Sequence, residues 1–194
     1  MKYAKPFQNC KPTDLTQGFF PKQHEANDWK APYGTFICAP FNAKVANIVG
    51  VEKDEIEKVD GSLNYTAQGC GIRLISTEDP TISISYWHCT SAGFTVNKGD
   101  IVLQGQPIAQ VGNTGMVYGN GTFYTAEERE VEYKASINVF PKKGVHAHIS
   151  MGQLVNGVYT SLDYSKLIDW SIPVKFNAFF YVMMLINKIK NLLK

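Results

Sequence analysis

Apolar and polar residues alternate through several short segments of this 194-residue chain. The alternation is clearest in residues 71–75 and 82–88, and it recurs in residues 44–51 and 144–150. Successive side chains of a β-strand point to opposite faces, so a period of two predicts strands with one buried face. Gly, Pro, Asn and Asp residues separate these segments, as expected for turns between antiparallel strands. The pattern therefore predicts an all-β domain.

Two further stretches extend this prediction. Residues 31–40 contain a turn that leads into a short strand. Residues 96–115 are punctuated by Lys-Gly-Asp, Gln-Gly-Gln and Gly-Asn-Thr-Gly, which predicts three short strands in a tight β-meander. The mixed acidic and basic run over residues 52–60 is interpreted as a solvated excursion between strands.

Three segments fall outside the alternating pattern. Residues 1–16 are polar and contain proline, which favours an N-terminal arm ahead of a domain over residues 17–170. Within that domain, residues 116–143 form an insertion. Thr125 and Glu128 have the spacing of a capping box, so the insertion is expected to contain a short charged helix.

The third segment, residues 171–194, is predicted to form a C-terminal helix. Ser171 and Pro173 suit its first turn. Apolar residues then recur at helical spacing and lysines gather at the end: Phe176, Phe179, Phe180, Met183, Ile186 and Ile189, then Lys188, Lys190 and Lys194. The longest apolar run, residues 178–186, has nine residues against about 20 needed to span a bilayer, which argues against a membrane span.

The apolar stripe of this helix has three interpretations. It packs on the flank of the β-domain, it docks the protein onto a neighbouring subunit, or it lies on a membrane surface. We favour docking, because a small β-domain with a groove rarely needs so aromatic an added helix.

Composition and charge narrow the function classes. The chain is 44% hydrophobic and 19% charged, with a net charge of +2 and no Lys/Arg block, which argues against a nucleic-acid partner. The four cysteines contain no Cys-x-x-Cys pair, which argues against a zinc knuckle or a thioredoxin-like motif: Cys10, Cys38, Cys70 and Cys89. Residues 1–6 lead into polar sequence without the apolar core of a signal peptide, so synthesis in a reducing cytoplasm with free thiols is expected.

All four histidines lie in segments that suit a site. His146 and His148 are two apart on a predicted strand, so both should point to the same face. His24 and Asp28 are four apart, which places them on one face of either a helical turn or an extended segment, and His88 ends a strand. Each residue alone is more often structural. Together, imidazoles and a carboxylate are suited to holding a metal and moving a proton.

The order of these residues resembles the lysostaphin/LytM-type zinc endopeptidases, which cut peptidoglycan peptides. The family pattern is a His-x-x-x-Asp, a later His at a strand end, and a His-x-His, here His24-x-x-x-Asp28, Tyr86-Trp87-His88 and His146-Ala147-His148. The segments Ala31-Pro32-Tyr33-Gly34-Thr35 and Gly112-Asn113-Thr114-Gly115 are also similar to family segments. The resemblance covers roughly residues 17–115 and 143–152.

This chain departs from the family pattern at two places. Ala26 stands where the family usually has Gly two residues after its first His, which affects the local backbone rather than the ligands. The insertion over residues 116–143 is longer than the usual link to His-x-His. It should border the groove, so substrate choice cannot be carried over from the family.

The resemblance implies a fold and a set of roles. The fold would be an antiparallel β-sheet or β-sandwich groove of the LytM, or duplicated-hybrid-motif, type. His24, Asp28 and His148 would hold Zn²⁺ and leave one position open for water. His146 would take the proton of that water and pass it to the leaving amine, and His88 would orient the water or stabilise the oxyanion.

Two function classes follow from this resemblance. The first is a zinc endopeptidase acting on peptidoglycan crosslinks, most naturally a phage lysin or a virion-associated lytic protein that acts at the cell wall. The second is a non-catalytic structural or adaptor protein on the same fold, within a phage tail or a cell-wall assembly. The expected partners of the protein are peptidoglycan peptides and, through the C-terminal helix, neighbouring virion subunits.

Overall fold

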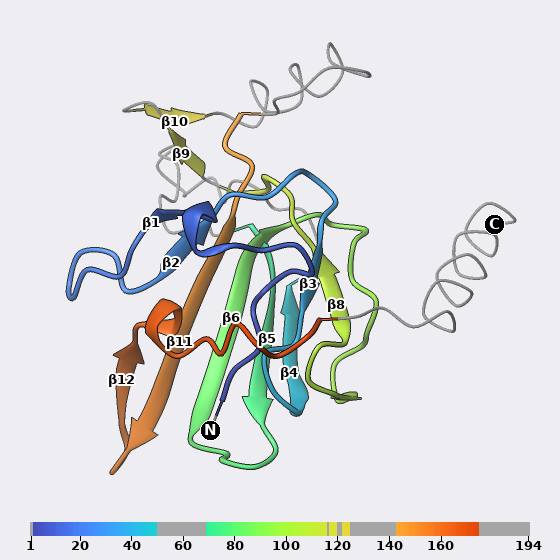
Figure 1. The fold of residues 1–194 in the computed structure, drawn as a ribbon, viewed down its shortest axis with the longest axis vertical. Helices are drawn as coiled ribbons and strands as arrows, with labels where there is room; N and C mark the ends of the chain where they lie inside the picture. The colour runs from blue at the N-terminus through green and yellow to red at the C-terminus, as the bar shows by residue number, and fades with distance from the viewer. Residues whose placement is uncertain (1, 50–68, 116, 120–121, 125–142, 175–194) are drawn as a thin grey trace, which may run out of the picture.

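A computed structural model describes residues 2–49, 69–115, 117–119, 122–124 and 143–174 of the chain. Its centre is an eight-stranded, antiparallel main sheet (Figure 1). Seven strands follow the order β1 (Leu15–Gln17), β2 (Asn27–Trp29), β11 (Ala147–Val155), β6 (Ile82–Cys89), β5 (Cys70–Ser76), β4 (Ala43–Val49) and β7 (Ile101–Val102). The eighth strand, β12 (Val158–Leu162), pairs with β11. The prediction of an all-β antiparallel domain is confirmed.

Two small sheets and two 3₁₀ turns complete the described fold. One sheet pairs β3 (Phe36–Cys38) with β8 (Pro107–Gln110), and the other pairs β9 (Val117–Gly119) with β10 (Thr122–Tyr124). The 3₁₀ turns are η1 (Pro12–Asp14) and η2 (Tyr164–Lys166).

The predicted three-stranded meander over residues 96–115 is wrong. This segment forms two strands that belong to different sheets, because β7 pairs with β4 and β8 pairs with β3. The glycine-containing turns were identified correctly as breaks. They carry the chain from the edge of the main sheet across its face, instead of returning it to its own neighbour.

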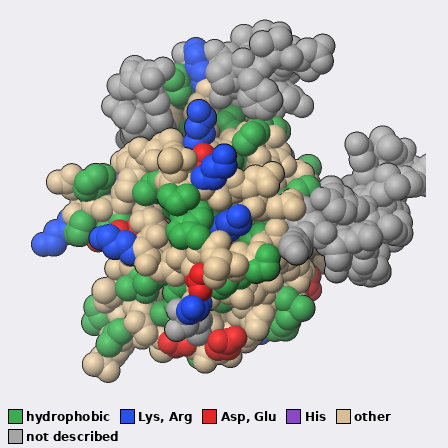
Figure 2. Space-filling view, in the orientation of Figure 1, with side chains coloured by type: hydrophobic (Ala, Val, Ile, Leu, Met, Phe, Trp, Pro, Cys, Tyr) green, Lys and Arg blue, Asp and Glu red, His purple; other side chains and the backbone are tan. Residues whose placement is uncertain are grey.

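One face of the main sheet is covered and the other carries the histidines. Alternate residues of the central strands are less than 2% exposed on the covered face, among them Trp29, Leu74, Ile84, Tyr86 and Ile149. They join one core with residues of the β3–β8 sheet and of the N-terminal segment. Figure 2 shows the outside of the molecule from the viewpoint of Figure 1, with lysine and arginine side chains interleaved with apolar and acidic ones.

The structure corrects the prediction of an N-terminal arm over residues 1–16. Tyr3 and Phe7 are 6% and 3% exposed and belong to the core. The Asp169 amide donates to the Tyr3 carbonyl, and the Tyr164 hydroxyl donates to the carbonyl of Ala4. A few apolar side chains among polar neighbours were enough to anchor the segment, although its average composition resembled that of a loop.

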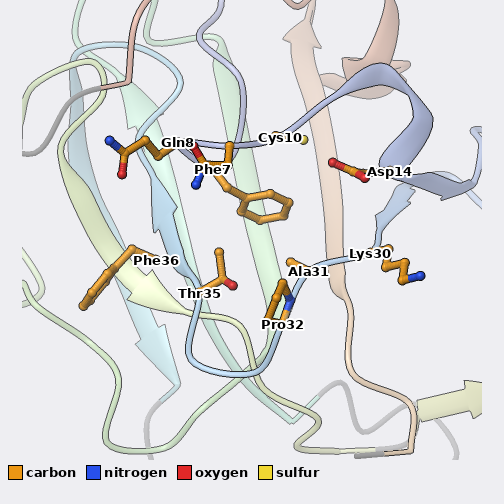
Figure 3. Close-up of a pocket in the computed structure, with 10 residues that line it drawn as sticks. Phe7, Gln8, Cys10, Asp14, Lys30, Ala31, Pro32, Thr35 and Phe36 are labelled. Carbon is orange, nitrogen blue, oxygen red and sulfur yellow. The ribbon is translucent and has the colours of Figure 1, made fainter. Parts of the chain in front are cut away.

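A cavity of about 230 Å³ lies between this N-terminal segment and residues 30–36 (Figure 3). Phe7, Cys10 and Pro32 contribute to its lining. All four cysteines are buried, and none of them forms a disulfide in the structure. Burial raises the pKa of the Cys10 and Cys38 thiols to about 12, so neither is a reactive thiolate at neutral pH.

Several predictions fall on residues outside the described part of the chain. They are the solvated excursion at 52–60, the charged helix opened by Thr125 and Glu128, and the C-terminal helix beyond residue 174. Ser171 itself lies in a turn, where its hydroxyl donates to Asp169, and Val174 is buried. Within the described residues, the structure contains no helix that is long and apolar enough to cross a membrane.

Candidate metal centre

The candidate site lies where β2, β11 and β6 run side by side (Figure 1). Asp28 on β2 is directly opposite His148 on β11, and His148 is directly opposite Trp87 on β6. Asn27 and Trp29 are buried on the core side, so Asp28 points to the other face of the sheet. Strand alternation thus places Asp28 and His148 together on this second face, which we call the open face.

His24 approaches the open face from the turn that precedes β2. Its backbone forms an isolated bridge with Phe20, and its Nδ1 donates to the Gly18 carbonyl at 3.0 Å. The other ring nitrogen, Nε2, lies 3.3 Å from Asp28 Oδ2. The backbone therefore fixes the imidazole so that Nε2 faces the carboxylate.

His146 and His148 enter the site in different ways. His146 precedes β11 instead of lying on it, which corrects the expectation of two neighbouring positions on one strand. Its Nδ1 donates to the Gly144 carbonyl at 2.9 Å, and its Nε2 lies 3.8 Å from Asp28 Oδ1. His148 lies on β11 and presents Nδ1 at 2.9 Å from the same oxygen.

His88 completes the cluster from the end of β6. Its φ of +58° is in the left-handed region, which is uncommon for a residue with a side chain and is typical of functional sites. Its Nδ1 donates to the Thr114 carbonyl at 2.8 Å, and its carbonyl accepts from the Gly112 amide. The ring centroid of His88 lies 4.7 Å from that of His146, so the two imidazoles are neighbours.

The electrostatics of the cluster keep the inner imidazoles neutral and the carboxyl ionised. Burial raises the pKa of Asp28, but hydrogen bonding by His148 and the charges of the surrounding imidazoles outweigh it, so the pKa lies below its ordinary value. Burial, followed by repulsion from His146 and His148, lowers the pKa of His88 to about 3. Burial also lowers the pKa of His146. At neutral pH, His88 and His146 are therefore uncharged.

Two overlapping groups of side chains are close enough to share one cation. The first is His24, Asp28 and His148, and the second is His88, His146 and His148, each with ligand atoms within 4.8 Å of one another. The first group joins two imidazoles and a carboxylate, the donor set of a catalytic zinc site with an open position.

The environment of Asp28 also fits a cation. Its Oδ1 is buried, and the groups nearest to it are imidazole nitrogens, His148 Nδ1 at 2.9 Å and His146 Nε2 at 3.8 Å. A bound divalent ion would satisfy this oxygen.

The structure brings together all five residues that the sequence indicated as candidates. It also shows the backbone groups that orient them, which the sequence analysis did not identify: the carbonyls of Gly18, Thr114 and Gly144. Thr114 has a second role, because its hydroxyl accepts from the Cys70 amide and donates to the Cys89 carbonyl, joining β5 to β6 beside His88. The Gly-Asn-Thr-Gly segment was the available signal, but it was interpreted as a turn that resembles a family segment, without a role for Thr114.

Comparison with known proteins gives a family match. A family profile described as Peptidase family M23 matches residues 22–135, more than half of the chain. The matched segment contains His24, Asp28 and His88 and ends before His146. A search of curated proteins finds no match.

Two solved structures with TM-scores above 0.5 show the same fold at low sequence identity. Helicobacter pylori Csd3 is 15% identical with a TM-score of 0.53, and the match covers 99% of this chain and 42% of that one. The solution structure of lysostaphin is 18% identical with a TM-score of 0.51, covering 92% and 63% of the two chains. LytU is 22% identical with a TM-score of 0.48, covering 77% and 80%. The chain thus spans less than two thirds of Csd3 and of lysostaphin.

Proposed function

Because the chain belongs to peptidase family M23, we propose that it is a zinc-dependent endopeptidase that hydrolyses peptide crosslinks of bacterial peptidoglycan. The observation that carries this proposal is the intact cluster of Asp28 and four histidines, with His24 and His148 beside the Asp28 carboxylate. Zn²⁺ is the cofactor that the family and this donor set assign to the site. The choice of peptidoglycan rests on the resemblance of the ordered motifs to lysostaphin/LytM-type enzymes.

His24, Asp28 and His148 are the residues that would hold the ion. The tautomer of His24 is already set for this role, since its Nδ1 proton is given to the Gly18 carbonyl and Nε2 is free. His148 has its Nδ1 at 2.9 Å from Asp28 Oδ1, so this nitrogen would be its ligand atom. When bound, zinc supplies a Lewis acid that polarises the scissile carbonyl and activates the attacking water.

His146 is placed to act as the general base. Its Nδ1 proton is given to the Gly144 carbonyl, which leaves Nε2 as a proton acceptor facing the Asp28 carboxylate. Burial keeps this imidazole neutral at neutral pH. It can therefore take a proton from the attacking water and pass it to the leaving amine.

His88 is better suited to orienting water than to stabilising an oxyanion. Its Nδ1 proton is given to the Thr114 carbonyl, so its Nε2 is an acceptor when the ring is neutral. Stabilising an oxyanion would need a second ring proton, which burial disfavours. An acceptor beside His146 can hold the attacking water by one of its O–H groups.

The experiment that tests the proposal measures metal and cleavage together. The purified full chain is expected to contain about one zinc per molecule and to release peptides from purified cell walls. Chelation should abolish release, and added zinc should restore it. Zinc-loaded protein that leaves walls of every crosslink chemistry intact would instead favour the non-catalytic adaptor. The phage or virion setting remains a prediction.

Gly144→Ala is expected to reduce turnover while zinc is retained. Gly144 has a φ of +68°, and an added Cβ would lie 2.4 Å from Val117 Cγ2, so Val117 and the Gly144 backbone must move apart, which displaces the carbonyl that orients His146. Misplacing a proton-transfer group by about 1 Å lowers the rate on the order of 10²-fold. The measurement is kcat on wall peptides together with zinc content.

Gly157→Ala is the matched control for this prediction. Gly157 has a φ of +79° at the tip of the β11–β12 hairpin, and an added Cβ there would meet nothing within 4 Å. Both substitutions introduce similar backbone strain, but only one displaces a site residue. Equal turnover in the two variants would contradict a role for the Gly144 carbonyl.

A further inference from the structure

The open face continues beyond the metal centre as a polar row on the next pleat of the sheet. Ser150 on β11 is opposite Ser85 on β6, and Ser85 is opposite Arg73 on β5. Ser150 is two residues from His148 on the same strand, so the whole row shares the face of the metal centre. Strand register alone thus places a guanidinium on the same surface as the reacting groups.

Arg73 is exposed and is oriented by a hydroxyl group. Its Nη2 donates to Ser83 Oγ at 3.2 Å. Because Ser83 is only 5% exposed, this hydrogen bond anchors the exposed guanidinium to a buried hydroxyl of the sheet. Among the residues that the structure describes, no carboxylate forms an ion pair with Arg73. Its remaining N–H donors are therefore available to a ligand in a fork that matches a planar carboxylate.

Trp87 connects the metal centre with Arg73. It is the strand partner of His148, and its ring occupies the space above Gly71, where an added Cβ would lie 2.3 Å from the indole. Gly71 is two residues before Arg73 on β5 and shares its face. A partly exposed indole thus leads from the imidazoles toward the guanidinium, an apolar surface on which a peptide can lie.

We propose that Arg73 is a specificity residue that binds a free carboxylate of the substrate peptide. The inference rests on the proposed peptidase function and names a subsite of the same open face. The guanidinium is held at Ser83, which lies four residues along β6 from Trp87, the strand partner of His148. With residues about 3.3 Å apart along a strand, this separation is about 13 Å. An extended peptide covers that distance in about four residues. The recognised carboxylate therefore lies three or four residues from the cleaved bond.

The test uses peptides that differ only in one charge. The wall peptide that the zinc-loaded full chain cleaves best is synthesised with all carboxyl groups free, with the terminal carboxyl amidated, or with a side-chain carboxyl amidated. The kcat/KM of the wild type should fall about 10- to 100-fold on one of the two amidated forms, the size of a charge-assisted hydrogen-bond pair. If kcat/KM falls on the terminally amidated peptide, the recognised carboxylate is the terminal one. If it falls on the peptide amidated in a side chain, the recognised carboxylate is in that side chain.

The Arg73→Gln variant should lose this discrimination. It should cleave the free peptide about as slowly as the wild type cleaves the amidated one, with no further loss on the amidated peptide and with unchanged zinc. Arg73→Lys should recover part of the preference, since it keeps the charge without the fork. Lys44→Gln is the control, because Lys44 is an exposed cation on the same face, opposite Ile75.

The outcomes separate this inference from the function on which it rests. A wild type that cleaves without preference, or an Arg73→Gln variant that keeps the preference, would overturn the carboxylate site alone. An equal loss in Lys44→Gln would reduce the effect to general surface charge and overturn it as well. If the zinc-loaded wild type cleaved no wall peptide, the proposed function would fall and the subsite with it.

Discussion

Replacing His148 by alanine is expected to remove bound zinc and wall cleavage together. His148 belongs to both groups of side chains that can share a cation, and its Nδ1 is the imidazole nitrogen nearest to Asp28 Oδ1. Without it, His24 and Asp28 leave too few ligands for a catalytic site of three. We expect zinc to fall from about one per molecule to near none after dialysis, with cleavage at background.

Ser150→Ala provides the matched control on the same strand and face. Ser150 is partly buried and opposite Ser85, one pleat away from His148. Its zinc content should equal that of the wild type, as determined by elemental analysis on protein checked for folding by circular dichroism. Equal zinc in the His148→Ala variant would show that His148 is not a ligand.

The clustering of the candidate site residues could be predicted from sequence because they stand in short motifs with local spacing. Strand alternation fixes the face of Asp28 and His148, and the ordered motifs of a known family indicate that distant segments meet. Neither signal depends on details of packing. For the same reason, the β-strands with clear alternation, such as residues 71–75 and 82–88, were found near their observed bounds.

What the sequence could not supply depends on contacts between distant segments. The carbonyls of Thr114 and Gly144 orient His88 and His146, but a carbonyl belongs to every residue and leaves no trace in the sequence. The left-handed backbone of His88 has no local cause, since it is held by the chain around Gly112. The pairing of β7 and β8 with strands of different sheets is likewise determined by contacts between distant segments.

Substitution of His146 or His88 by alanine should separate metal binding from catalysis. Both residues lie outside the group formed by His24, Asp28 and His148, so both variants are expected to keep zinc. Loss of a positioned general base lowers turnover by about 10²–10⁴-fold, and we expect His146→Ala to fall within that range. His88→Ala should also lose turnover, because its Nε2 no longer holds the water that His146 deprotonates.

The pH dependence distinguishes the base from the ligands. Burial lowers the pKa of His146 below its ordinary value of 6.5, so the base is active at neutral pH and is lost only as the pH falls through that lowered value. The acidic limb of kcat/KM for the wild type should accordingly lie below pH 6.5, at pH values where bound zinc is still measured.

Added imidazole gives a second measurement of the same role. A diffusible base can replace the missing proton acceptor in His146→Ala, so imidazole should restore part of its turnover. Imidazole should restore less turnover to His88→Ala, because this variant still has its base and has lost only the group that orients the water. Near-normal cleavage by either variant, with zinc bound, would contradict the role assigned to that histidine. Loss of zinc from His146→Ala would instead move it into the ligand set with His88 and His148, the second group that the geometry allows.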